Sequence, residues 1–141
     1  MDNKSLMRRF YQEVVNERRL EVIDEICAED AVDHQVPPGL PPGREGIRAW
    51  FAGFMEAVPD LHVEMGEMLA EGDLCAARAI WTGTQQGDLP GLPATGKGFT
   101  VEGIDLVRFA DGRAVEHWGV TDEAGMLRQL GVIPEPAMAS S

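Results

Sequence analysis

Apolar side chains at the start of the chain recur with the spacing of an amphipathic helix: Leu6, Met7, Phe10, Tyr11 and Val14. This pattern predicts a helix that ends near Asn16 and is capped by Asp2 or Asn3. A shorter apolar face follows over residues 20–27, and residues 31–36 are predicted as a short strand. The first elements are therefore expected in the order helix, helix, strand.

The strongest helical pattern of the chain follows Arg44 and contains Ile47, Trp50, Phe51, Phe54, Met55 and Val58. Pro59 ends this predicted helix, because the residue before a proline is turned away from helical geometry. Residues 37–43, Pro-Pro-Gly-Leu-Pro-Pro-Gly, lack the amide donors that a helix or a strand ladder needs. They are predicted to form a stiff loop at the rim of any pocket.

Four strands are predicted after this helix, over residues 60–70, 74–85, 98–109 and 113–121. Neighbours in the sequence should pair antiparallel, because Glu-Gly-Asp, a Gly/Pro-rich loop and Ala-Asp-Gly join them in turn. A last helix is expected to start at Thr121 or Asp122 and to end at Gly131.

This order of elements predicts an α+β fold in which a curved, mostly antiparallel sheet wraps around the N-terminal helices. Such a sheet forms a cone with an internal apolar pocket. The length of 141 residues and the apolar content of 44% fit a single domain. We assign this domain to residues 1–134 and expect residues 135–141 to be a disordered tail.

The charge and the cysteines exclude several classes of function. A formal net charge of −12 repels phosphate backbones and anionic lipid surfaces, so nucleic-acid and membrane partners are not expected. Cys27 and Cys75 form no Cys-x-x-Cys motif, and no apolar run is long enough for an export signal or a membrane span. We expect a cytoplasmic protein with reduced thiols.

The hairpin around Asp111-Gly112 brings two candidate acid/base residues together. A three-residue loop, which we favour, would place Asp105 directly opposite His117. A two-residue loop would put the two side chains on opposite faces of the sheet. A carboxylate beside an imidazole can tune a proton-transfer group, but such cross-strand pairs also occur as purely structural hydrogen bonds.

The remaining pocket positions are assigned to Asp33, His34, Trp50, Phe54, Val101, Gly103 and Gly119. Asp33 and His34 are neighbours on a predicted strand, so only one of them can point into the pocket. The opposite face of the sheet carries Ile104, Leu106 and Trp118 among charged residues, a mixture typical of a subunit interface. We expect a homodimer through this face.

No metal or cofactor is expected. The 3 histidines have no metal-ligand spacing. Residues 91–98 imitate a phosphate-binding loop as far as Lys97, but they contain Pro93, lack the Ser or Thr that holds magnesium, and lead into a strand. We therefore reject nucleotide binding.

Several short motifs occur in order along the chain: Pro-Asp-Leu-His-Val-Glu (59–64), Ala-Glu-Gly-Asp (70–73), Thr-Gly-Thr-Gln-Gln-Gly (82–87), Gly-Leu-Pro-Ala-Thr-Gly (91–96), Asp-Gly-Arg-Ala-Val-Glu-His-Trp (111–118) and Leu-Arg-Gln-Leu-Gly (127–131). Together they resemble the SnoaL-like polyketide cyclase (ester cyclase) family of the nuclear-transport-factor-2-like (NTF2-like) superfamily. The resemblance covers nearly the whole chain. It implies the cone-shaped α+β fold and ring closure by intramolecular aldol condensation, with no metal or cofactor, in an apolar pocket.

The resemblance also implies which residues matter and where this chain departs from the family. The family carries His-x-Asp on its last strand, and the Asp is its principal acid/base group. His117 matches the His, but Gly119 stands at the position of the Asp. Asp105 falls where the cyclases carry a pocket histidine, Gly103 replaces another polar pocket residue, and Asp33 replaces an asparagine.

We expect an enzyme that performs acid/base chemistry on an apolar carbonyl compound. Asp105 would orient His117, and His117 would abstract or return a proton next to the carbonyl. Because of Gly119, a non-catalytic ligand-binding protein or accessory dimer is one alternative. Hydrolysis or isomerisation of an epoxide or ester is another, in which Asp33 and Asp105 would converge on one water.

Overall fold

The computed structural model describes residues 2–134. Its helices are α1 (Asn3–Arg9), the π-helix η1 (Phe10–Asn16), the 3-10 helix η2 (Leu20–Val22), α2 (Ile23–Ile26), α3 (Arg44–Ala57) and α4 (Glu123–Gln129). Its strands are β1 (Cys27–Asp33), β2 (His62–Glu71), β3 (Leu74–Thr84), β4 (Gly98–Ala110) and β5 (Arg113–Thr121). The order of elements agrees with the order predicted from the sequence. The expected tail, residues 135–141, lies outside the described residues.

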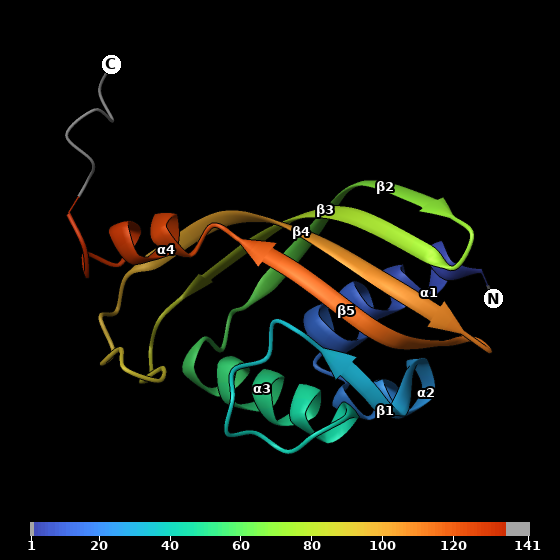
Figure 1. The fold of residues 1–141 in the computed structure, drawn as a ribbon. Coiled ribbons are helices and arrows are strands. Elements are labelled where there is room, and N and C mark those ends of the chain that lie inside the picture. Colours follow the sequence, from blue (N-terminus) through green and yellow to red (C-terminus); the bar gives the residue numbers. More distant parts are fainter. Residues whose placement is uncertain (1, 135–141) are drawn as a thin grey trace.

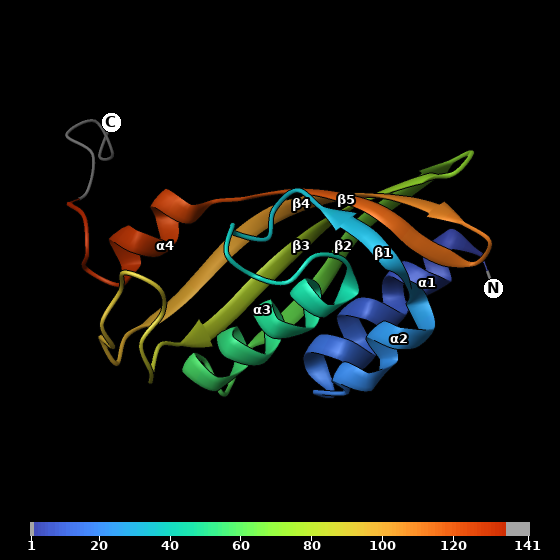
Figure 2. The same cartoon turned by 60° about the horizontal axis from the view of Figure 1, so that its bottom comes forward.

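The five strands form one curved, unclosed sheet in the order β1-β5-β4-β3-β2 (Figure 1). β1 is parallel to β5 and the other neighbours are antiparallel, which confirms the predicted meander. Figure 2 shows α1, α2 and α3 on one face of the sheet, here called the inner face. The opposite, outer face carries no helix of the described chain. The expected α+β fold, with a curved sheet around the N-terminal helices, is confirmed.

The N-terminal helical segment changes geometry part-way along its length. It begins at the Asp2 side chain, which accepts the Ser5 N–H at 2.8 Å, and from Phe10 it continues as the π-helix η1. The Asn16 side chain fastens the end of η1 to β2, because it donates to the Val63 carbonyl and accepts the Val63 N–H, both at 2.9 Å. The predicted apolar stripe thus reaches the inner face of the sheet.

The first strand begins earlier and ends earlier than predicted. β1 runs from Cys27 to Asp33, whereas the sequence pattern indicated residues 31–36. Its hydrogen-bond partner is β5, so Cys27 pairs with Ala114 and Asp33 with His117. This pairing is distant in sequence, and a local pattern cannot show where it begins.

The β4–β5 hairpin has a two-residue turn, so the three-residue loop favoured from the sequence is wrong. Asp111 and Gly112 have φ angles of 52° and 76°, and two left-handed residues give a turn whose twist matches that of the flanking strands. Ala110 pairs with Arg113, but Val115 has no partner on β4. This β-bulge shifts the register of the rest of the hairpin.

The other predicted boundaries agree closely with the structure. α3 ends at Ala57, just before Pro59, and Asp122 caps α4 by accepting the Gly125 N–H at 2.9 Å. No helix among residues 2–134 is long and apolar enough to cross a membrane.

Candidate functional site

Asp105 and His117 both point to the inner face, but they are not the directly opposed pair that the sequence indicated. Asp105 pairs with Gly119, and His117 pairs with Val107. With a two-residue turn and no bulge, His117 would lie on the outer face. Because Val115 is left unpaired, the register shifts by one residue and His117 lies on the inner face. The two side chains meet diagonally, with His117 Nε2 at 2.8 Å from Asp105 Oδ1.

Four side chains from four elements form a continuous chain of hydrogen bonds. The Tyr11 hydroxyl on η1 donates to Asp105 Oδ2 on β4 at 2.6 Å. On the other side of Asp105, the His117 ring on β5 reaches across to β1, where its Nδ1 lies 2.8 Å from Asp33 Oδ1. Asp33 Oδ1 also accepts the backbone N–H of Gln35 at 2.9 Å. Every polar group of the His117 ring is therefore bonded to a carboxylate.

The electrostatics of this chain favour a charged imidazole. Burial opposes the charge, but the hydrogen bonds to Asp105 and Asp33 and their negative charges outweigh it and raise the pKa of His117 to about 9. At neutral pH both ring N–H groups donate to the carboxylates. Burial, followed by the charge of Asp105, raises the pKa of Tyr11 well above its usual value, so its hydroxyl remains a donor.

These polar groups face a cavity of about 440 Å³ between the helices and the inner face of the sheet. This volume lies within the range of small-molecule sites. The predicted pocket residues Asp33, Trp50, Phe54 and Val101 contribute to its wall, together with Asp105 and His117. Most of the remaining wall is apolar, with Phe10, Phe51, Trp81, Phe99 and Met126 among its residues.

His34, assigned to the pocket from the sequence, lies on the outer face instead. Asp33 occupies the inward position, and successive residues of an extended segment point to opposite sides. The His34 ring stacks on Trp118 with centroids 5.2 Å apart, and its Nε2 lies 2.7 Å from Glu116 Oε2. Its assignment to the pocket is therefore corrected.

Gly103 and Gly119, also assigned to the pocket, are not among the residues that line the cavity. A Cβ atom at Gly103 would lie 3.1 Å from Thr121 Oγ1, so Thr121 covers this position. A Cβ atom at Gly119 would overlap Gln35 Oε1 and lie 3.0 Å from Asp105 Oδ1. The side chains of Gln35 and Asp105 therefore occupy the space in front of Gly119.

No group of three or more His, Cys, Asp or Glu side chains within residues 2–134 is arranged to hold a metal ion. The two thiols offer no reactive nucleophile either. Burial raises the pKa of Cys27 to about 12, and burial also raises the pKa of Cys75. The chemistry of the site is that of carboxylates, an imidazolium and a phenol.

The family model for SnoaL-like polyketide cyclases matches residues 5–130. The chain belongs to the SnoaL-like polyketide cyclase family. Solved structures agree in both fold and extent. TsrD from Streptomyces laurentii is 31% identical, with a TM-score of 0.86 over 94% of this chain and 99% of that chain. IdmH from Streptomyces antibioticus is 33% identical, with a TM-score of 0.80 over 94% of this chain and 100% of that chain.

Two curated proteins are similar over a shorter stretch. The aklanonic acid methyl ester cyclase DnrD of Streptomyces peucetius is 38% identical over 72 residues, which is 51% of this chain and 50% of DnrD. The aklanonic acid methyl ester cyclase DauD of Streptomyces sp. (strain C5) is 36% identical over 72 residues, which is 51% of this chain and 45% of DauD. The matched stretch spans about half the length of these curated relatives.

Two residues of this SnoaL-like cyclase site were not identified from the sequence. Tyr11 belongs to the apolar stripe predicted for the first helix, and no local signal distinguishes it from Phe10. Gln35 follows the predicted Asp33-His34 pair, and its side chain donates to Thr121 Oγ1 at 3.0 Å. Both residues reach the site through contacts that are distant in sequence.

Proposed function

We propose that this chain catalyses cofactor-independent proton transfer at the carbon next to a carbonyl group of an uncharged, apolar substrate, as in an aldol ring closure. One observation carries the proposal. The carboxylate of Asp105 borders a largely apolar cavity and is held there by two donors, Tyr11 and His117. A carboxylate fixed beside bound substrate can serve as a general base.

Asp105 is a better proton acceptor than His117 in this arrangement. Both nitrogens of His117 face carboxylates, and its pKa of about 9 keeps the ring protonated at neutral pH. Each oxygen of Asp105 accepts one hydrogen bond and retains a second lone pair. The proposal therefore reverses the roles expected from the sequence, in which Asp105 oriented His117 as the base.

The proposed reaction conserves its proton. Asp105 removes a proton from the carbon next to one carbonyl, and the enolate carbon then attacks a second carbonyl of the same molecule. The new carbon–carbon bond leaves an alkoxide, to which Asp105 returns the proton. The His117 imidazolium stabilises the Asp105 carboxylate before and after the transfer.

The charges of the cavity wall favour a substrate without a free carboxylate. Asp33, Asp105 and Glu123 line the cavity, and no arginine or lysine occurs among its described lining residues. A ligand carboxylate would lie near like charges with only His117 as a cation, and His117 is already paired. An ester or a ketone fits better, and DnrD and DauD are named as cyclases of a methyl ester.

Proton exchange tests the proposal without the natural substrate. Aryl 1,3-diketones that carry a methyl ester would be incubated with the protein in D₂O, and loss of the proton next to the carbonyl would be followed by NMR. We expect Asp105→Asn to slow exchange by about 10²-fold and the matching free acids to exchange slowly. Asp60→Asn is the matched control, because Asp60 accepts the Thr84 hydroxyl at 2.9 Å outside this cavity.

Equal exchange rates in the unaltered protein and Asp105→Asn would rule out Asp105 as the base. Saturable binding of the esters without exchange, preserved in both Asp105→Asn and His117→Ala, would favour the non-catalytic alternative. Hydrolysis at a shared water is less well supported, because Asp33 and Asp105 approach opposite nitrogens of the His117 ring.

We also propose that two copies associate through the outer face of the sheet, where Leu106 and Trp118 are half-buried. Ile104 and Val120 pair across β4 and β5 and are 51% and 76% exposed. Val32 on the neighbouring β1 is 51% exposed. Exposed apolar side chains among charged residues on one face of a sheet are typical of a subunit interface.

A further inference from the structure

The Tyr11 hydroxyl is a buried polar group that forms and breaks no bond to substrate in the proposed proton transfer. Tyr11 is 2% exposed, and it contacts Asp105, which is distant in sequence, at 2.6 Å. The hydroxyl of a buried tyrosine needs a hydrogen-bond partner, and here the partner is a carboxylate that borders the cavity. The bond therefore acts on the group proposed as the base.

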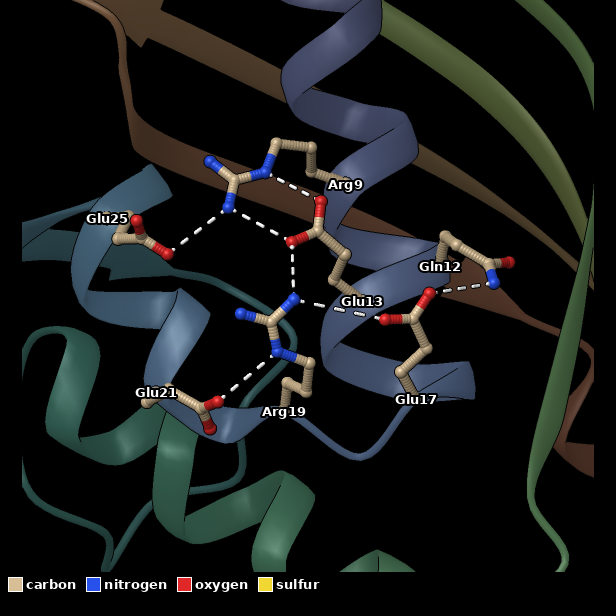
Figure 3. Close-up of polar contacts among 7 residues, drawn as sticks. All are labelled: Arg9, Gln12, Glu13, Glu17, Arg19, Glu21 and Glu25. Carbon is tan, nitrogen blue, oxygen red and sulfur yellow. Dashed lines mark hydrogen bonds and ion pairs between the residues drawn. The ribbon is translucent and has the colours of Figure 1, made fainter.

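The helix that carries Tyr11 is fixed at both ends and along its outer side. Asn3 donates to the Gly72 carbonyl at 3.2 Å, and Asn16 bonds both backbone groups of Val63. Figure 3 shows Arg9 bound to Glu13 and Glu25, and Arg19 also bound to Glu13. These ion pairs link α1 and η1 to α2 and to the segment before it. Each exposed pair contributes little alone, but together they hold η1 in place.

The phenol ring of Tyr11 is confined by its aromatic neighbours. It packs edge to face against Trp81, with centroids 6.2 Å apart and planes at 71°. It packs similarly against Phe10, at 6.4 Å and 85°. The ring therefore cannot turn its hydroxyl away from Asp105 without displacing these side chains.

We propose that Tyr11 is a positioning residue that fixes the carboxylate plane of Asp105 in the cavity wall. The terminal torsion of an aspartate is soft, so one hydrogen bond leaves the carboxylate able to rotate. Tyr11 on Oδ2 and His117 on Oδ1 hold both of its oxygens. The remaining lone pairs then keep one orientation towards the cavity. This inference rests on the proposed function, which makes Asp105 the base.

The role also has a kinetic consequence. Loss of the Tyr11 hydroxyl should slow the proton transfer, because the Asp105 carboxylate loses its fixed orientation, and should leave ligand binding nearly unchanged. A merely structural tyrosine would affect folding without separating the exchange rate from the ligand affinity.

The experiment compares the unaltered protein with Tyr11→Phe. Proton exchange of the methyl ester diketones and their binding affinity would both be measured at pH 7. In Tyr11→Phe, exchange should slow by about 10-fold, while ligand affinity should change less than about 3-fold. Thr84→Val also removes one hydroxyl–carboxylate bond, outside the cavity, and should leave both quantities unchanged.

A second variant keeps the test decisive if Tyr11→Phe does not fold. The chain contains 1 tyrosine, so growth on 3-fluorotyrosine labels Tyr11 alone. The ¹⁹F resonance of this residue should shift in Asp105→Asn and stay in place in Asp60→Asn, because only Asp105 accepts the phenol hydroxyl. A resonance that Asp105→Asn leaves in place, or a folded Tyr11→Phe that exchanges as fast as the unaltered protein, would overturn the inference. A resonance that shifts in a protein that exchanges no substrate protons would support the contact and refute the proposed function instead.

Discussion

His117 carries its charge between two carboxylates, and this makes the stability of the fold depend on pH. The pKa of the folded ring is about 9, against an ordinary value of 6.5. A group whose pKa is raised by folding contributes stability that is complete below its unfolded pKa and is lost as the pH rises through its folded pKa. A shift of this size corresponds to about 3 kcal/mol.

We predict that the free energy of unfolding in urea falls by about 3 kcal/mol between pH 6 and pH 9.5. His117→Gln should remove most of this dependence, whereas His34→Gln should retain it because His34 is bonded on the outer face. The buried thiols add a decrease above about pH 8.5, where unfolded cysteine ionises, and both histidine variants share that decrease with the unaltered protein. A flat profile, or a His117 ring that titrates near 6.5 by NMR, would contradict the charged site.

Single residues show which parts of the site were accessible from the sequence. Asp105 and His117 could be chosen because Asp-Gly marks the hairpin turn and pairing across it brings a carboxylate close to an imidazole, although the favoured turn length was wrong. The choice between Asp33 and His34 had to stay open. Alternation along a strand shows that the two side chains point to opposite faces, but it does not show which face is the inner one. Tyr11 could not be found, because an apolar helical stripe gives no sign that one of its members reaches a carboxylate on β4.

At the scale of elements, the β-bulge keeps Val115 out of the β4–β5 ladder; if Val115 were paired, every later residue of β5 would face the other side of the sheet. Pairing is regular on both sides of it, with Ala114 opposite Phe109 and Glu116 opposite Arg108. Val115 itself has no partner. If it were removed, the same pairs would join into a continuous ladder and His117 would stay on the inner face.

We therefore predict that deletion of Val115 is tolerated and that deletion of Leu106 is not. Loss of the half-buried valine should cost about 1–2 kcal/mol, with cooperative urea unfolding and a raised pKa of His117 preserved. Deletion of Leu106 moves Asp105 to the outer face and should abolish cooperative folding. If the shortened protein without Val115 folded but His117 titrated normally, the bulge would not be a simple insertion.

Element boundaries marked by local chemistry were predictable. Pro59 marked the end of α3, and Asp122 was one of two capping residues considered for α4. The start of β1 follows from its pairing with β5, and the bulge follows from the pairing of β5 with β4. Neither could be predicted from a local pattern. A turn motif indicates that a hairpin exists, but a single extra residue further along the strand changes its register without altering the hydrophobic pattern.

At the scale of the whole molecule, the two faces of the sheet differ in what covers them. Helices cover the inner face (Figure 2). The cavity lies between these helices and the sheet. The outer face has no helix of the described chain, yet it carries Ile104 and Val120 in an exposed position. The sequence indicated large apolar side chains on both faces of β4. Val101 and Val107 lie on one face, and Ile104 and Leu106 lie on the other.

The outer face predicts how the protein assembles. If two copies bury it, a charge at its centre should separate them, because a buried unpaired charge is costly. We expect the unaltered protein to sediment as a dimer and Ile104→Glu to shift towards monomer by at least 10-fold in dissociation constant. Val132→Glu is the matched control, because Val132 is 46% exposed on the segment after α4. A monomeric unaltered protein, or an Ile104→Glu variant that stays dimeric, would show that this face does not join two copies.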